Sequence, residues 1–219
     1  MNDIHELQRL ASPAPKPQSL AWDGATLWMG SRETRRIYAI NPATWTVGWE
    51  AAAPGTPYGM TAVGRELRVL CSETAEDRRI IRRCVPEKGF DEKFSVPCPD
   101  DTGSQLGYDG RRLHVSQWYP KKVIALGADG KVERTIHVPH GICGQVFVEG
   151  VLYLVTTDAE ETNEYWLTRV DLGKTEAAEP KIEDVARIPF QARALAWDGT
   201  KFWTNHREQN EIVAFARVG

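Results

Sequence analysis

Short apolar runs separated by polar turns follow one another along this chain, and the pattern found near the amino terminus recurs near the carboxyl terminus. Residues 20–40 read LAWDGATLWMGSRETRRIYAI, and residues 195–215 read LAWDGTKFWTNHREQNEIVAF. Each run contains an apolar segment, an Asp-Gly turn, a second segment with a Trp, a polar loop and a third apolar segment. Self-similarity of this kind is typical of repeat architectures.

Five copies of the unit emerge when the chain is aligned on the turn glycine. The residue four positions before this glycine is always apolar, and a third segment with apolar residues three apart follows 13 or 17 positions after it. The longer spacing occurs in copies two and four, which therefore carry a loop four residues longer. The turn glycines are Gly24, Gly64, Gly110, Gly150 and Gly199.

A fourth segment follows the third in every copy except the last, at 46–51, 92–97, 131–139 and 183–189. The fifth copy runs out at Gly219, but residues 4–13 (IHELQRLASP) resemble the other fourth segments. We therefore predict an all-β, five-bladed β-propeller of four-stranded antiparallel blades, in which the amino-terminal strand completes the last blade and closes the ring. The prediction is one domain, 1–219, with repeats starting near 18, 58, 104, 144 and 193.

Composition narrows the class of partner. The net charge of -3 and the absence of a basic stripe argue against nucleic acid and against anionic membranes. The first residues lack the basic and apolar regions of a signal peptide, and nowhere do eighteen apolar residues run together. We therefore expect a soluble, cytoplasmic protein.

The four cysteines form neither a zinc-ribbon pattern nor a dense disulfide framework, because their spacings are 13, 14 and 45 residues. The first interpretation is that they are buried free thiols. The alternative is that Cys71, Cys98 and Cys143 meet His140 in a soft metal site or around an activated nucleophile.

The loops between second and third segments, and those between units, lie at one edge of such sheets. They are longer and more polar than the turns at the other edge, so we expect a site where they surround the axis. Its occupant is predicted to be a small polar molecule, and these loops could also contact a protein partner. The predicted ligand-binding residues are Arg32, Tyr58, Gln105, Gln117, Trp118, Gln145 and Arg193, and Gln18 and Arg207 share the same mouth positions.

Four of the eight tryptophans and two long loops are predicted to have structural roles. We expect four tryptophans to pack between neighbouring sheets. The charge-rich loops 72–79 and 156–166 are expected to be solvated. The packing tryptophans are Trp22, Trp28, Trp197 and Trp203.

The series WDG, LW, a polar loop and IxxI resembles the propellers grouped around virginiamycin B lyases, NHL-type repeats and plant-type glutaminyl cyclases. His140 stands in PHGI, which is similar to the PHG motif of those lyases, and His206 ends a second segment, where they also carry a functional histidine. The resemblance implies that His206 is a general base and that His140 binds magnesium. We therefore take both histidines as candidate catalytic and metal-binding residues, with magnesium, calcium or zinc as the candidate metal.

Three functions stay open at this point. The first is binding of a small polar ligand at the channel mouth, extended to metal-assisted lyase or hydrolase chemistry. The second is a non-enzymatic scaffold for protein interactions. The third, a glutaminyl cyclase-like acyltransferase, needs a carboxylate deep in the channel. The inner segments offer only Asp23, Asp109, Glu149 and Asp198, all expected at the turn edge on the opposite face.

Overall fold

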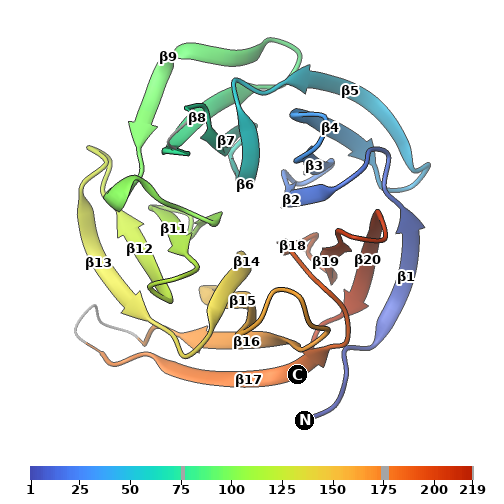
Figure 1. Ribbon diagram of the computed structural model, residues 1–219, viewed down its shortest axis with the longest axis vertical. Helices are drawn as coiled ribbons and strands as arrows, with labels where there is room; N and C mark the ends of the chain where they lie inside the picture. The colour runs from blue at the N-terminus through green and yellow to red at the C-terminus, as the bar shows by residue number, and fades with distance from the viewer. Residues whose placement is uncertain (75–76, 174–177, 219) are drawn as a thin grey trace.

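Five four-stranded antiparallel sheets surround a central axis in the computed structural model of this chain, which describes residues 1–74, 77–173 and 178–218 (Figure 1). Among these residues the single helical element is a 3-10 turn, η1 (Pro99–Asp101). No helix in this part of the chain has the length and apolar character needed to cross a membrane. The prediction of an all-β, five-bladed propeller is confirmed.

Each blade runs from an inner strand at the axis to an outer strand at the rim (Figure 1). Blade 1 contains β2 (Pro17–Trp22), β3 (Leu27–Ser31), β4 (Arg36–Asn41) and β5 (Thr46–Ala52). Blade 2 contains β6 (Thr56–Val63), β7 (Glu66–Ser72), β8 (Arg79–Val85) and β9 (Gly89–Pro97). Blade 3 contains β10 (Gln105–Tyr108), β11 (Leu113–Gln117), β12 (Lys122–Leu126) and β13 (Val132–His137).

Blade 4 contains β14 (Gly141–Val148), β15 (Val151–Thr157), β16 (Tyr165–Asp171) and β17 (Lys181–Ile188). Blade 5 contains β18 (Ala196–Trp197), β19 (Lys201–His206) and β20 (Glu211–Ala216), and its outer strand is β1 (Glu6–Ala11). β1 pairs antiparallel with β20, with Leu10 opposite Ile212, and so joins the two ends of the chain. This confirms the predicted closure by the amino-terminal strand, which covers the outer edge of β20.

The apolar core is divided among the five interfaces between neighbouring blades. The cluster between blades 5 and 1, for example, contains Leu20, Met29 and Trp203, all almost completely buried. The four tryptophans assigned to packing all lie in or against such clusters. Two inner strands also approach their neighbours closely, because a Cβ on Gly59 would come within 2.5 Å of the Gln105 Cα atom.

The same set of hydrogen bonds to an Asp carboxylate occurs at the tight turns of blades 1 and 5. In blade 5, Asp198 accepts hydrogen bonds from the backbone N–H groups of Thr200 and Lys201 at 2.9 Å, and from the Trp203 indole at 2.8 Å. Asp23 makes the equivalent bonds in blade 1, including one from the Trp28 indole at 2.7 Å. These carboxylates therefore hold a turn and an interblade tryptophan together.

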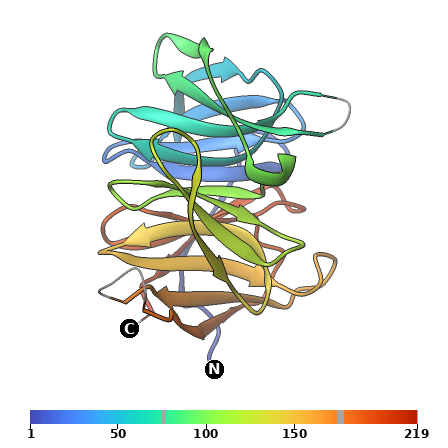
Figure 2. The same ribbon diagram turned by 90° about the vertical axis from the view of Figure 1, so that its left-hand side faces the viewer.

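The two faces of the ring differ in their loops. In the side view, η1 and the loop between β15 and β16 project from the same face (Figure 2). We call this face the mouth face and the opposite one, which carries the Asp turns, the turn face. The wide loops thus gather where the sequence predicted them.

Candidate functional site

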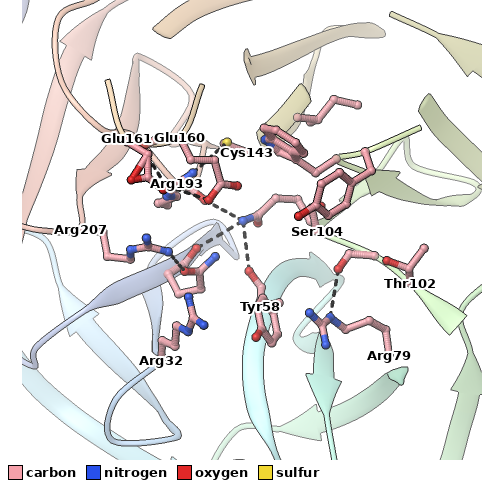
Figure 3. A pocket seen from close by; sticks show the side chains of 16 residues that line it. Arg32, Tyr58, Arg79, Thr102, Ser104, Cys143, Glu160, Glu161, Arg193 and Arg207 are labelled. Carbon is pink, nitrogen blue, oxygen red and sulfur yellow. Dashed lines mark hydrogen bonds and ion pairs between the residues drawn. The ribbon is translucent and has the colours of Figure 1, made fainter. Parts of the chain in front are cut away.

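A cavity of about 350 Å³ lies on the mouth face at the axis of the ring (Figure 3). All five blades contribute to its lining, through Gln18, Tyr58, Gln105, Cys143 and Arg193 among others. Its volume is within the range of sites that hold small molecules. Because each blade supplies different side chains, the lining is asymmetric although the scaffold is repeated.

Bulges at the beginning of the inner strands direct several of these side chains. The pairing of β2 with β3 skips one residue at Gln18, that of β6 with β7 skips Tyr58, and that of β14 with β15 skips Cys143. A β-bulge leaves one residue outside the ladder and changes its direction. All three skipped residues line the cavity. The bulges therefore convert the ends of regular strands into parts of a binding surface.

Alternation along the second strands decides which of their last residues reach the cavity. Arg32, Trp118 and Arg207 occupy the same position, eight residues after their turn glycines, and all three line the cavity. The position immediately before is occupied by Gln117 in blade 3 and by His206 in blade 5. Successive residues of a strand point to opposite faces. Neither Gln117 nor His206 is among the described residues that line the cavity.

The Gln105 amide closes the axis beneath the cavity. Its Nε2 atom donates to the backbone carbonyls of Arg193 at 2.6 Å, Tyr58 at 3.1 Å and Gln18 at 3.3 Å, so it ties four blades together. Gln145 continues this layer, since its Nε2 donates to the Gln105 carbonyl at 3.2 Å. The amides thus form a polar floor across the channel. Gln145 itself lines a smaller hollow of about 130 Å³ on the other side of this floor.

An arginine and tyrosine wall borders the cavity in blades 1 and 2. The Arg79 guanidinium lies 3.6 Å from the centre of the Tyr58 ring, and that of Arg32 lies 5.7 Å from it. Arg79 is held by a 3.2 Å bond to the Gly103 carbonyl and by an ion pair with Asp77. Arg32 is exposed and makes no ion pair with any residue in the described ranges. Within the described ranges the wall therefore offers one guanidinium without a carboxylate at ion-pair distance, although the Asp77 charge is near enough to interact with it.

The opposite wall belongs to blades 4 and 5 and carries the two glutamates of the lining together with Arg193 and Arg207. Glu160 pairs with the buried Arg193 at 3.2 Å, and Arg193 also contacts the Cys143 sulfur at 3.3 Å. Burial tends to lower the pKa of Arg193, but Cys143, Tyr165 and Glu160 together raise it above its ordinary value. Burial raises the pKa of the Cys143 thiol to about 11, so this thiol is protonated at neutral pH and is a poor nucleophile.

Arg207 completes the ring of charges between these walls. It donates to the Gln18 side-chain oxygen at 3.0 Å and to Glu208 at 3.1 Å. Burial, and then the neighbouring Arg193, lower its pKa below the ordinary arginine value. A cationic group that is partly desolvated and close to other cations gains from an anionic ligand. The lining therefore combines four arginines with Glu160 and Glu161.

His140 lies away from the cavity, within blade 4. Its Nδ1 atom is 2.8 Å from an Asp158 carboxylate oxygen, and its Nε2 atom is 3.4 Å from one of Asp184. The imidazole also stacks on Trp166, with ring centres 4.5 Å apart. Both ring nitrogens are thus engaged with the β15–β16 loop and the outer strand. His140 does not line the cavity among the described residues.

His206 faces the interior of blade 5, beside Phe190, with ring centres 5.2 Å apart. Its Nδ1 atom is 3.7 Å from a Glu211 oxygen, and burial lowers its pKa below the ordinary value. No group of three or more His, Cys, Asp or Glu side chains in the described ranges could hold a metal ion. The described side chains around His140 and His206 therefore do not converge on a common metal position. The catalytic and metal-binding roles of both histidines stay predictions.

Gln117 and Gln145 support the cavity from behind. The Gln117 amide donates to the carbonyls of Pro99 at 2.8 Å and Thr102 at 3.1 Å, which fastens the loop between blades 2 and 3. Of the seven residues predicted to bind ligand, five line the cavity and these two do not. The five lining residues are Arg32, Tyr58, Gln105, Trp118 and Arg193.

The cysteines are dispersed among different interfaces. Cys71, Cys98 and Cys143 belong to three separate apolar clusters, and all four cysteines are buried and free. Burial raises the pKa values of Cys71 and Cys98 to about 12. The expectation of buried free thiols is confirmed. Among the described residues, no shared thiol and histidine site brings these cysteines together.

The long loops contribute three lining residues that the sequence analysis assigned to solvated segments. Arg79 begins β8 after the longer loop of blade 2, while Glu160 and Glu161 stand in the longer loop of blade 4. Residues 75–76 of the first loop lie outside the described ranges. The signal that could have found these side chains was the extra length of four residues in copies two and four, at the mouth edge.

Neither a family model nor a curated protein matches this sequence. Solved structures do. Hydrazine synthase of Kuenenia stuttgartiensis superposes with a TM-score of 0.55 and 16% identity over 87% of this chain, which spans 62% of that one. The PQQ-bound aldose sugar dehydrogenase of Streptomyces coelicolor gives 0.57 and 14% over 98% of both chains. A streptogramin B lyase gives 0.53 and 13%, covering 97% of this chain and 70% of the other.

These likenesses establish the fold. Propellers of enzymes are among the neighbours, and a lyase propeller is one of them, which agrees with the resemblance that the repeat motif suggested. At 13 to 16% identity they carry no activity over to this chain, because one fold hosts many functions. The chemistry has to be argued from the cavity itself.

Proposed function

We propose that the mouth cavity binds a small organic anion, with a carboxylate or phosphate group against the Arg32, Tyr58 and Arg79 wall. The observation that carries the proposal is the uncompensated Arg32 guanidinium beside Arg79, at the edge of a cavity large enough for a small molecule. Guanidinium groups suit carboxylate and phosphate because their donors form a planar fork.

The charge distribution supports an anion. The chain as a whole carries a net charge of -3, yet four arginines and only two glutamates line this cavity. Glu160 compensates Arg193, Glu208 compensates Arg207 and Asp77 compensates Arg79. Arg32 has no carboxylate at ion-pair distance in the described ranges, and the Asp77 charge that acts on it from further away is already bound to Arg79.

Aromatic side chains suit the carbon skeleton of such a ligand. Trp118 and Tyr119 line the same cavity and meet edge to face, with ring centres 4.9 Å apart. Tyr119 is 86% exposed, so its ring is accessible to a ligand in the cavity. An organic anion can bury its apolar part against this pair while its charged group meets the arginines.

Ligand binding to the native state raises its stability, so thermal shifts and calorimetry test the proposal. We expect butyrate, benzoate or inorganic phosphate to raise the melting temperature in a saturable manner. Arg32→Gln should weaken the binding about five- to tenfold, which is typical of one lost charge-assisted contact. Arg111→Gln is the matched control, because Arg111 is exposed at a tight turn on the other face.

Two results would overturn the proposal. One is that none of the three anions shifts the melting temperature at millimolar concentration. The other is that Arg111→Gln weakens binding as much as Arg32→Gln, which would indicate a general surface charge effect instead of a site. Anions that bind at low salt and are displaced by moderate salt fit the proposal, because the pairing charges are partly exposed.

A further inference from the structure

The wall formed by blades 4 and 5 carries a carboxylate that has no ion-pair partner in the described ranges. Glu160 is paired with Arg193, but the Glu161 carboxylate makes no ion pair or hydrogen bond with any residue in the described ranges. Glu161 is exposed and lines the cavity. In Figure 3 it lies with Glu160 on one side, whereas Arg32, Tyr58 and Arg79 lie on the other. One free carboxylate thus faces one free guanidinium across the same cavity.

The loop that carries Glu161 is held in place by several hydrogen bonds. Thr157 Oγ1 donates to the Glu164 carbonyl at 2.8 Å, and the Tyr165 hydroxyl donates to the Glu160 carbonyl at 2.9 Å. The Gln191 amide donates to the carbonyl of Glu161 itself at 3.1 Å. These bonds hold the backbone of the loop, so a ligand has to order only the Glu161 side chain.

A neighbouring hollow extends the cavity on the side of Glu160 and Glu161. It shares Glu160, Glu161, Arg193 and Arg207 with the mouth cavity and adds Gln191 and Glu208. Its volume is about 350 Å³. Three carboxylates and two arginines border this hollow, and Glu208 also pairs with Lys16 at 2.6 Å. The groups without an ion-pair partner in the described ranges are Glu161 on the blade 4 side and Arg32 on the blade 1 side, and in this sense the site is dipolar.

We infer that the ligand is a small zwitterion, with a carboxylate against Arg32 and an ammonium group against Glu161. This inference rests on the anion binding proposed above and adds the second charge. A dipolar site selects such a ligand, because a simple anion leaves Glu161 without a partner and a simple cation leaves Arg32 without one. Molecules of this class are amino acids, betaines and other amino carboxylates.

Matched ligand pairs test the second charge separately from the first. Calorimetric titrations with butyrate and 4-aminobutyrate, and with hexanoate and 6-aminohexanoate, vary the ammonium group and the chain length. We expect at least one amino carboxylate to bind about two- to fivefold more tightly than its parent, which is the range that partly exposed ion pairs contribute. Hexylamine should bind more weakly than that amino carboxylate.

The variant Glu161→Gln should remove the preference for the amino carboxylate and leave the affinity for the parent anion unchanged or higher. Glu164→Gln is its control, since Glu164 stands in the same loop but does not line the cavity. Both side chains are exposed, so both variants should fold, as circular dichroism can show.

The possible failures are distinguishable. If neither parents nor amino carboxylates bind, anion binding itself is overturned. If the parents bind as tightly as every amino carboxylate, or if Glu161→Gln keeps the preference, the zwitterion inference is overturned while anion binding stands. If hexylamine binds as tightly as 6-aminohexanoate, the carboxylate contributes nothing and the dipolar assignment is wrong.

Discussion

The turn face and the mouth face of this ring use the same repeat in opposite ways. On the turn face, Asp23 and Asp198 make the same bonds to a turn backbone and to an interblade tryptophan. On the mouth face, corresponding positions hold Arg32, Trp118 and Arg207. A repeated side chain at a repeated place is explained by packing. A side chain that changes from blade to blade on a constant backbone points to a ligand.

Blades 1 and 5 sharpen this contrast because their sequences are so similar. Arg32 and Arg207 occupy the same register, and both line the cavity. Arg207 is restrained by Gln18 and Glu208, whereas Arg32 is exposed and stacks loosely above Tyr58. Arg207 is therefore held by the protein, whereas Arg32 is available to a ligand.

The largest effect on stability is expected at the turn face. Asp198→Ala removes acceptors from two backbone N–H groups and from the Trp203 indole. We expect a loss of about 2 to 3 kcal/mol in the free energy of unfolding, measured by urea denaturation. The control is Asp129→Ala, which loses a backbone bond and an ion pair at an exposed turn. An equal loss of unfolding free energy in both variants would contradict the structural role of the bonds from Asp198 to the turn and to Trp203.

The polar floor should come next. Gln105→Ala leaves the carbonyls of Gln18, Tyr58 and Arg193 without their shared donor. Because water can enter from the cavity, we expect a loss of about 1 to 2 kcal/mol in unfolding free energy, together with weaker ligand binding. Gln18→Ala removes only the hydrogen bond between the Gln18 side chain and Arg207, so its loss in unfolding free energy should be smaller. If Gln105→Ala changed neither the free energy of unfolding nor the ligand affinity, the ligand would have to bind elsewhere.

Acid should act through the turn face. Burial opposes ionisation of Asp109, but bonds from the Arg112 and Arg111 N–H groups and from His114 lower its pKa to about 2. A lowered carboxyl pKa contributes stability that is complete above the unfolded value near 4 and disappears as the pH falls through 2. We expect about 1 kcal/mol from this group in that window, which is less than the full shift implies because solvent screens a partly exposed carboxylate. Urea titrations of Asp109→Asn should show a flatter profile than those of the wild type between pH 4 and 2.

The smallest effect on stability is expected at the mouth. Arg32→Gln should change the free energy of unfolding by less than about 0.5 kcal/mol, because the side chain is exposed and makes no ion pair in the described ranges. Thermal denaturation without ligand is the measurement. A loss above about 1 kcal/mol would mean that Arg32 supports the ring, and the division between the faces would disappear.

The fold was predictable because its information is local and repeated. The turn glycines and the apolar residues around them mark the strands of every blade, and residues 4–13 match the missing outer strand. The site was harder, since its details depend on alternation and on bulges. His206 and Arg207 are adjacent in sequence, yet only Arg207 reaches the cavity. Glu161 was missed because a charged residue in a long loop looks the same whether it meets solvent or a ligand.

The pairing of β1 with β20 also shapes how the protein can be made. Arg9 contacts Glu211 across 202 residues of chain, so this blade has to wait until the last strand has been synthesised. Contacts of such sequence separation carry a large entropy of loop closure and form slowly. Until β20 is available, β1 has no partner in its own sheet, and we expect the docking of these two strands to be among the slow steps of folding.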